Sequence, residues 1–243
     1  MKLRKIYPKY IILLLAAILV SSQIDADTTE LAIIEYGAVY ELKMSKVPLR
    51  IEILREVTAT DGQKKIAVFK ASSAFFEIDQ KSTFTLNRGE IVSSEYFYKK
   101  RTLGKTDRQS FTLAQDINLS EPTSARGKFG ENIFDKLSVQ YQLQLDLIQE
   151  SEEEEIKVGR SFSYRVQDKG SLKPYKFVVA SIDKIDTKLG ALRALRIIRE
   201  RRKENRSTIL WLAPKYKYTL VKMIQREKGK NWQLDIKGWS KKR

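Results

Sequence analysis

Basic side chains gather in one short stretch of the chain, and they are its first candidates for chemistry. Five of them fall within eight residues: Arg199, Arg201, Arg202, Lys203 and Arg206. The planar fork of a guanidinium can bind phosphate or carboxylate through two hydrogen bonds at once. We therefore interpret these five residues as a candidate anion contact. The alternative is a charged tip, turning at Glu204-Asn205, that keeps a hairpin from 192 to 212 soluble and blocks pairing at its edge.

The residue types that the chain lacks exclude several kinds of active site. It contains no His and no Cys, which rules out a Ser-His-Asp triad, a thiol nucleophile, a zinc site of imidazole or thiolate ligands, and any disulfide. Ser181 and Lys184 have the spacing of a Ser-Lys acyl-transfer pair, but that chemistry needs both on one helical face, and 177–185 has the pattern of a strand. A hydrolase using two carboxylates is the enzyme alternative. We predict a protein that is not an enzyme, with no catalytic residue, no cofactor and no metal.

Two further clusters have simple interpretations. The four glutamates at 152–155 could bind calcium, but no Asp-x-Asp-x-Asp-Gly pattern accompanies them, and a run of like charges is usually solvated. Aromatic residues stand beside basic ones at 96–101 and 211–218, an arrangement that can bind sugars or lipid headgroups. Alternating aromatic residues more often line the core of a sheet, and we favour the core for most of them.

Residues 1–26 have the features of a secretory signal peptide. The basic start comprises Lys2, Arg4, Lys5 and Lys9. An unbroken apolar run at 11–20 and a polar stretch follow it. The run is about half of the roughly 20 residues that a membrane-spanning helix needs. We expect cleavage near Ser22 or Ala26, export to the periplasm and no transmembrane span in the mature chain; an uncleaved anchor is the alternative.

The charge of the chain points to an anionic partner. The chain has 46 basic and 30 acidic residues, a formal charge of +16. Without residues 1–26, which hold four basic residues and Asp25, 42 basic and 29 acidic residues remain, a charge of +13. In a cytoplasmic protein this excess would favour nucleic acid. For an exported protein we expect lipid, lipopolysaccharide or acidic glycan, or an envelope protein, and no nucleic acid.

The elements that must position these groups are mostly strands. Apolar and polar residues alternate at 36–44, 51–57, 162–166 and 232–236, which is typical of antiparallel strands with one packed face. Turns with glycine separate these runs: Asp61-Gly62, Asn87-Arg88-Gly89, Asp168-Lys169-Gly170 and Lys228-Gly229. We predict one mainly β domain at 27–243, a large curled antiparallel sheet or open barrel of about eleven strands. The alternation also predicts that Trp232 is buried.

The segment 134–149 fits two patterns. Phe134, Leu137, Tyr141, Leu145 and Ile148 form a helical stripe. The odd-numbered residues from 137 to 147 also alternate as in a strand. Because the segment is long and rich in Leu and Gln, we predict one inserted α-helix at about 134–149, with Asp135 as its cap. The glutamates at 152–155 would then form a solvated connection.

The C-terminal half resembles a known family. Its motifs are T-x-x-G-x-x-x-x-L, from Thr187 to Leu195, and W-L-A-P, from Trp211 to Pro214. With the strand at 36–44 and the segment F-D-K-L-S at 134–138, they resemble the domain-of-unknown-function 3108 family of exported bacterial proteins. The residue after Pro214 is often acidic in that family but is Lys215 here, so the surface charge of relatives does not transfer.

This resemblance implies a periplasmic, mostly antiparallel β protein with a helix inserted midway, and no established activity. A strongly curved sheet with an apolar inner face can enclose an acyl chain or a similar guest. We therefore expect a non-enzymatic binder or carrier of an amphipathic or anionic envelope component. The alternative is a structural or assembly partner of a cell-envelope complex.

Overall fold

A computed structural model describes residues 33–45, 47–60, 64–113, 132–200 and 206–242. The predicted leader, 1–26, lies outside the described residues. The strands and helices are β1 (Tyr36–Met44), β2 (Val47–Ala59), β3 (Lys65–Ser73), β4 (Phe76–Asn87), β5 (Glu90–Thr102), β6 (Lys105–Thr112), β7 (Ile133–Phe134), α1 (Ser138–Glu153), β8 (Ser161–Asp168), β9 (Ser171–Thr187), β10 (Gly190–Glu200), β11 (Arg206–Ala213), the 3-10 turn η2 (Pro214–Tyr216), β12 (Thr219–Glu227) and β13 (Lys230–Lys241).

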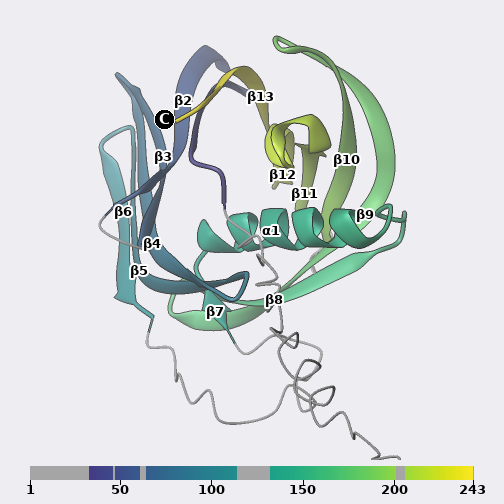
Figure 1. The fold of residues 1–243 in the computed structure, drawn as a ribbon. Helices are drawn as coiled ribbons and strands as arrows, with labels where there is room; N and C mark the ends of the chain where they lie inside the picture. The colour runs from purple at the N-terminus through teal and green to yellow at the C-terminus, as the bar shows by residue number, and fades with distance from the viewer. Residues whose placement is uncertain (1–32, 46, 61–63, 114–131, 201–205, 243) are drawn as a thin grey trace, which may run out of the picture. The chain divides into compact units, whose positions relative to one another are not determined.

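The strands form one sheet, as the alternation predicts. Their order is β6-β5-β4-β3-β2-β1-β13-β12-β11-β10-β9-β8-β7. Every pairing is antiparallel except that of β7 with β8. Figure 1 shows the sheet curling so that β4–β6 and β9–β10 lie on opposite sides of α1, with β8 passing below it. The mainly β, curled antiparallel class is confirmed, with thirteen strands in the described residues instead of about eleven.

Four hairpins turn through a two-residue X-Gly pair. In each pair both residues have a positive φ: Arg88-Gly89, Leu103-Gly104, Lys169-Gly170 and Lys228-Gly229. This geometry matches the right-handed twist of the strands that the turn connects. Three of these turns were predicted from the sequence. Asp61-Gly62 lies outside the described residues.

The inserted helix begins later than predicted. It runs from Ser138 to Glu153, whereas Ile133 and Phe134 form the short strand β7 beside β8. Asp135 nevertheless acts as the expected cap, because its Oδ1 accepts hydrogen bonds from the backbone N–H groups of Leu137 (2.7 Å) and Ser138 (2.9 Å). The glutamates at 152–155 are exposed, although the helix includes the first two of them. Among the described residues no helix is long and apolar enough to cross a bilayer.

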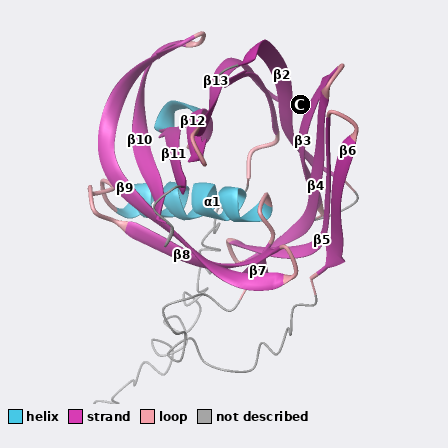
Figure 2. Cartoon of the chain, turned by 180° about the vertical axis from the view of Figure 1, so that it is seen from behind, coloured by secondary structure: helices cyan, strands magenta, loops and turns pink. Residues whose placement is uncertain are grey.

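Burial on nearly all sides explains why the helix sequence fits two patterns. Figure 2 shows α1 lying across the hollow of the sheet. Its buried residues are Ser138, Val139, Tyr141, Gln142, Leu143, Gln144, Leu145, Leu147 and Ile148. A helix enclosed in this way needs apolar residues around its circumference and not on one stripe.

The buried polar groups of α1 are matched to the surrounding sheet. Gln142 accepts a hydrogen bond from the backbone N–H of Ile91 (2.7 Å), and Gln144 donates to the carbonyl of Lys217 (2.6 Å). Since an unpaired buried polar group costs about 1–3 kcal/mol, these bonds fix the helix within the sheet.

A buried arginine joins α1 to β2. Arg55 is 3% exposed, and its Nε donates to the hydroxyl of Tyr141 (3.0 Å) while Nη1 donates to Oε1 of Gln140 (3.0 Å). No carboxylate in the described part of the chain pairs with it. The helix therefore supplies the neutral partners that keep this guanidinium hydrogen-bonded inside the protein.

Candidate functional site

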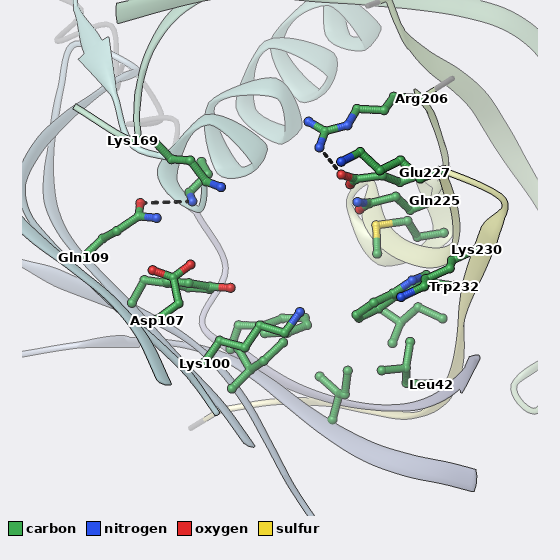
Figure 3. A pocket seen from close by; sticks show the side chains of 18 residues that line it. Leu42, Lys100, Asp107, Gln109, Lys169, Arg206, Gln225, Glu227, Lys230 and Trp232 are labelled. Carbon is green, nitrogen blue, oxygen red and sulfur yellow. Dashed lines mark hydrogen bonds and ion pairs between the residues drawn. The ribbon is translucent and has the colours of Figure 1, made fainter. Parts of the chain in front are cut away.

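An open cavity of about 530 Å³ lies on the inner face of the sheet, beside the start of α1. Alternate residues of a strand point to the same face, so β1–β6 and β11–β13 each send side chains into it. Figure 3 shows these side chains surrounding a central space. The volume falls within the range of about 300–1,000 Å³ that is usual for small-ligand sites.

One part of the cavity wall is apolar. Its residues are Leu42, Ile53, Phe69, Ile78, Met223, Trp232 and Leu234. They come from β1, β2, β3, β4, β12 and β13 at positions where each strand faces inward. Trp232 is only partly buried, because it borders this open space; its prediction as a buried core residue was wrong for that reason.

The cavity is also strongly basic. It is lined by six cationic side chains, Lys100, Lys136, Lys169, Arg206, Lys228 and Lys230, and by two acidic ones, Asp107 and Glu227. An excess of one sign of charge in a hollow with apolar walls concentrates the electrostatic field and attracts ligands of the opposite sign. The apolar wall and this field together suit a ligand that has both an apolar part and a negative charge.

Lys100 is the cation placed most directly against the apolar wall. Its Nζ lies 4.7 Å from the ring centroid of Trp232 and 5.7 Å from that of Phe76. Burial lowers the pKa of Lys100 below its ordinary value. Among the described residues no carboxylate forms an ion pair with it. Lys100 therefore has a charge available for a bound anion.

Lys136, in contrast, already has several partners. Its Nζ donates to Oε1 of Gln109 (3.3 Å), lies 3.5 Å from Oδ1 of Asp168 and is 4.8 Å from the ring centroid of Tyr98. Burial lowers the pKa of Lys136. Burial alone would raise the pKa of Asp168, but the ammonium groups of Lys136 and Lys173 outweigh it and the pKa is lowered. Lys136 thus helps to hold the cavity together.

A second cavity of about 300 Å³ adjoins the first. The two share Tyr98, Lys136, Met223 and Gln225. Burial raises the pKa of Tyr98 to about 12, so its hydroxyl stays protonated at neutral pH and is able to donate a hydrogen bond. Because the second cavity also reaches Val139 and Gln140 of α1, the combined space extends towards the side of that helix. We call the end of the first cavity at Lys228 and Lys230 its mouth.

The structure places only two residues of the predicted anion contact. Arg199 stacks over the ring of Tyr175 and lines the second cavity, whereas Arg206 lines the first and pairs with Glu227. Both belong to the predicted hairpin, since β10 and β11 pair antiparallel. Neither stands on a purely solvated tip, because both line a hollow. Arg201, Arg202 and Lys203 lie outside the described residues.

The other motifs have structural roles. Ser181 and Lys184 lie on β9, and residues three apart on a strand face opposite sides. The hydroxyl of Ser181 donates to Oδ1 of Asp183 (2.7 Å), and the indole of Trp211 donates to Oδ2 (2.8 Å). Ser181 therefore helps to orient a carboxylate that anchors Trp211.

Of the aromatic residues beside basic ones, most lie in the core, as favoured from the sequence. Tyr96, Trp211 and Tyr218 are buried, and Tyr216 packs against the core. Phe97 is exposed and Tyr98 lines both cavities. The lysines that matter for the cavity, above all Lys100, were missed as site residues. For Lys100 the sequence does contain a signal: it follows Tyr96 and Tyr98 at intervals of two residues, which places all three on the same face of one strand.

Comparisons with known proteins give a family and some distant structural likenesses. No curated protein matches the sequence. A β-barrel-like protein of the domain of unknown function DUF1849 from Brucella abortus has 10% identity and a TM-score of 0.49, covering 87% of this chain and 99% of that one. A putative lipoprotein from Parabacteroides distasonis has 8% identity and a TM-score of 0.32, covering 86% and 96%. A DUF1329 family protein from Desulfovibrio piger has 7% identity and a TM-score of 0.30, covering 88% of each chain.

The family comparison is more direct than these likenesses. The model of the family described as "Protein of unknown function (DUF3108)" matches residues 33–229, a range that contains all the motifs from which the resemblance was inferred. The match contains α1 and every strand of the sheet except β13, which begins at Lys230. The chain therefore belongs to the DUF3108 family of proteins of unknown function.

Proposed function

We propose that this protein is a non-enzymatic binder or carrier of an anionic amphipathic molecule of the cell envelope. The observation that carries the proposal is the position of Lys100, a cation without a carboxylate partner among the described residues, against the apolar wall of a 530 Å³ cavity. An apolar tail would lie on that wall, and its acidic headgroup would meet the basic side chains.

The size of the hollow supports a ligand with one tail. The two adjoining cavities measure about 530 and 300 Å³, which is the volume range of single small-molecule ligands. A lipid with many acyl chains, such as lipopolysaccharide, would leave most of its apolar surface outside. We therefore favour a fatty acid, a lysophospholipid or a similar single-chain acid as the ligand class.

Two features of the sequence support the non-enzymatic role and the location in the cell envelope. The absence of His and Cys removes the commonest general base and the most reactive nucleophile, in keeping with a role in binding. The basic and then apolar segment at 1–20 supports export through a signal peptide, which would bring the protein to envelope lipids.

A titration with a fluorescent single-chain fatty acid, below its micelle-forming concentration, tests the proposal. The protein should bind it saturably and bind the matching alcohol more weakly. Lys100→Gln should weaken binding of the acid about tenfold, because one charge-assisted contact contributes about 1.5–3 kcal/mol and 1.4 kcal/mol is tenfold. Its effect on the alcohol should be small.

The matched control is Arg193→Gln, which removes an exposed cation that pairs with Glu155 and lines neither cavity. It should bind the acid as the unaltered protein does. Absence of saturable binding of both acid and alcohol would exclude the proposal, and so would equal losses in the two variants.

A second candidate function is assembly with another envelope protein. The specific observation in its favour is the edge strand β6, which pairs with β5 and with no other strand in the described residues. An open edge can accept a strand of a partner, although Lys105, Asp107 and Arg108 on β6 are the kind of charged residues that discourage it. Crosslinking in cells distinguishes the two functions, since a carrier gives lipid adducts and an assembly factor gives defined protein bands.

A further inference from the structure

Two hairpin tips next to each other present large apolar side chains to solvent. Phe75, between β3 and β4, is 65% exposed, and Leu103, between β5 and β6, is 77% exposed. They are the two most exposed large apolar residues in the described part of the chain. The backbone N–H of Leu103 donates to the carbonyl of Phe75 (3.1 Å), so the two tips form one apolar patch, here called the 75/103 tip.

Leu103 stands where the other hairpins have a charge. In the four X-Gly turns the first residue is Arg88, Lys169, Lys228 or Leu103. Leu103 has a φ of 49°, in the left-handed region that disfavours a side chain of this kind. Neither solvation nor backbone preference selects leucine at this position, which points to a requirement for its apolar side chain.

The 75/103 tip lies beside the mouth of the cavity. Phe76, next to Phe75, packs its ring 6.2 Å from that of Trp232 in the cavity wall. Lys100, three residues before Leu103, lies over both rings. Because neighbouring strands are antiparallel, the turns β3–β4, β5–β6 and β12–β13 fall at the same end of the sheet. The apolar tip and the cavity residues Lys228 and Lys230 therefore lie at the same end of the sheet.

The charges around the tip are predominantly positive. Lys105 is exposed directly after the turn, and Arg101 lies before it. Glu77, the acidic residue of β4 nearest the tip, is paired with both Lys99 (2.8 Å) and Arg101 (3.1 Å). Lys228 and Lys230 line the mouth at the neighbouring turn. Exposed Phe and Leu within a basic surround are typical of segments that insert into the headgroup region of an anionic bilayer.

We propose that the 75/103 tip docks this protein on an anionic phospholipid surface, with Phe75 and Leu103 inserted among the headgroups and the cavity mouth facing the membrane. This goes beyond ligand binding, since it assigns a membrane contact to residues outside the cavity. It also gives a single-chain lipid a short path from the bilayer to the apolar wall.

Sedimentation with phosphatidylcholine vesicles, with and without phosphatidylglycerol, tests the docking. The protein should bind the anionic vesicles and release them at high salt. The variant Phe75→Lys/Leu103→Lys should bind them at least tenfold more weakly although it is more positive. If attraction were purely electrostatic, this variant would bind more tightly, and that result would overturn the proposal.

The control is Val158→Lys, at an apolar residue that is 60% exposed on another loop; it should bind as tightly as the unaltered protein or slightly more so. All variants should unfold at similar urea concentrations. The variant Phe75→Lys/Leu103→Lys should also bind the soluble fatty acid with unchanged affinity. A failure of membrane docking is thereby distinguished from a failure of ligand binding.

The position of the tip in the membrane is measured directly with a probe. Because the chain has no cysteine, Leu103→Cys offers one labelling site for an environment-sensitive fluorophore. Its emission should shift to the blue on anionic vesicles and be quenched by brominated lipids, whereas a probe at exposed Thr112, at the other end of β6, should not respond. An unshifted probe at 103 on vesicles that the protein binds, or a photocrosslink from 103 to a protein and not to lipid, would overturn the proposal.

Discussion

The inner face of one sheet meets two different environments along the same strands. Towards one end, Tyr36 and Tyr40 of β1 are completely buried in the core beside α1, and the ring of Tyr36 lies 6.5 Å from that of Tyr141. Towards the other end, Leu42 of the same strand borders the open cavity. We call these the helix-filled region and the open region.

The two regions treat charge differently. In the helix-filled region Arg55 is held by Tyr141 and Gln140, and Asp135 accepts a hydrogen bond from Ser82 (2.5 Å) besides those from the backbone. In the open region Lys100 contacts only aromatic rings through its ammonium group, within the described residues. Hydrogen bonds to buried charged groups are what a stable interior requires. An available cation beside an apolar wall has no such role in stabilising the fold, and the proposed binding of an anionic amphipathic ligand rests on this difference.

The largest expected effect is on stability in the helix-filled region. Leu145→Ala should lower the free energy of unfolding by about 2–5 kcal/mol, since it empties a completely buried position. Met223→Ala, which removes a partly buried side chain that already borders both cavities, should cost about 1 kcal/mol. Urea denaturation measures both. Equal losses would mean that the open region is as closely packed as the filled one.

Asp135 makes the free energy of unfolding depend on pH, and it does so from the helix-filled region. Burial raises the pKa of Asp135 above its ordinary value, although Ser82 and two backbone N–H groups oppose this. A carboxyl with a raised pKa in the folded state stabilises the fold fully only when protonated, and that contribution is lost as the pH rises through the raised pKa. Relative to Asp135→Asn, the unaltered protein should therefore become more stable as the pH falls towards 4.

Asp135→Ala is the companion change. It removes the acceptor for Leu137, Ser138 and Ser82 and should cost about 1–3 kcal/mol at neutral pH. Denaturation curves at several pH values measure both variants. A stability difference between the unaltered protein and Asp135→Asn that does not change with pH would contradict the raised pKa.

In the open region the pH should act on binding. Burial lowers the pKa of Lys100 and outweighs the opposing effect of Asp107 and Glu227; Lys230 and Lys169 lower it slightly further. Since only the protonated form attracts an anion, affinity for the fatty acid should fall as the pH rises through this lowered pKa, before an ordinary lysine would titrate. Lys100→Gln should remove most of that fall. Titrations from neutral pH upwards measure it; an identical pH profile in the variant would show that another cation binds the headgroup.

Much of this fold could be predicted from periodicity because one face of each strand is packed. At 51–57 the alternation of Ile51, Ile53 and Val57 gives the inward face correctly. The inward position between them holds Arg55, and that break in the apolar pattern marks the guanidinium that binds α1. A polar residue at an inward position is therefore a signal that the sequence did contain.

Periodicity could not predict which parts of the sheet's inner face are covered by α1 and which border an open cavity. Alternation places Trp232 and Lys100 on the inner face, but whether a side chain meets α1 or an empty space depends on how far the helix extends across the sheet. That depends on contacts distant in the chain, such as Gln142 with Ile91 and Gln144 with Lys217. The run of basic residues at 199–206 has the same limit, because a run in the sequence gives no information on pairing across strands, such as that of Arg206 with Glu227.

The smallest effect concerns Arg206, the member of that cluster which lines the cavity. Its guanidinium already pairs with Glu227 on β12, and a partly exposed pair of this kind contributes little net field. Arg206→Gln should therefore weaken binding of the fatty acid by only about threefold, well below the about tenfold loss for Lys100→Gln. Glu227→Gln should instead strengthen binding by about threefold, because it leaves the guanidinium free for the ligand. If Arg206→Gln lost as much affinity as Lys100→Gln, the headgroup would be held at the β11–β12 side of the mouth, and the boundary of the open region would have to be extended towards the predicted cluster.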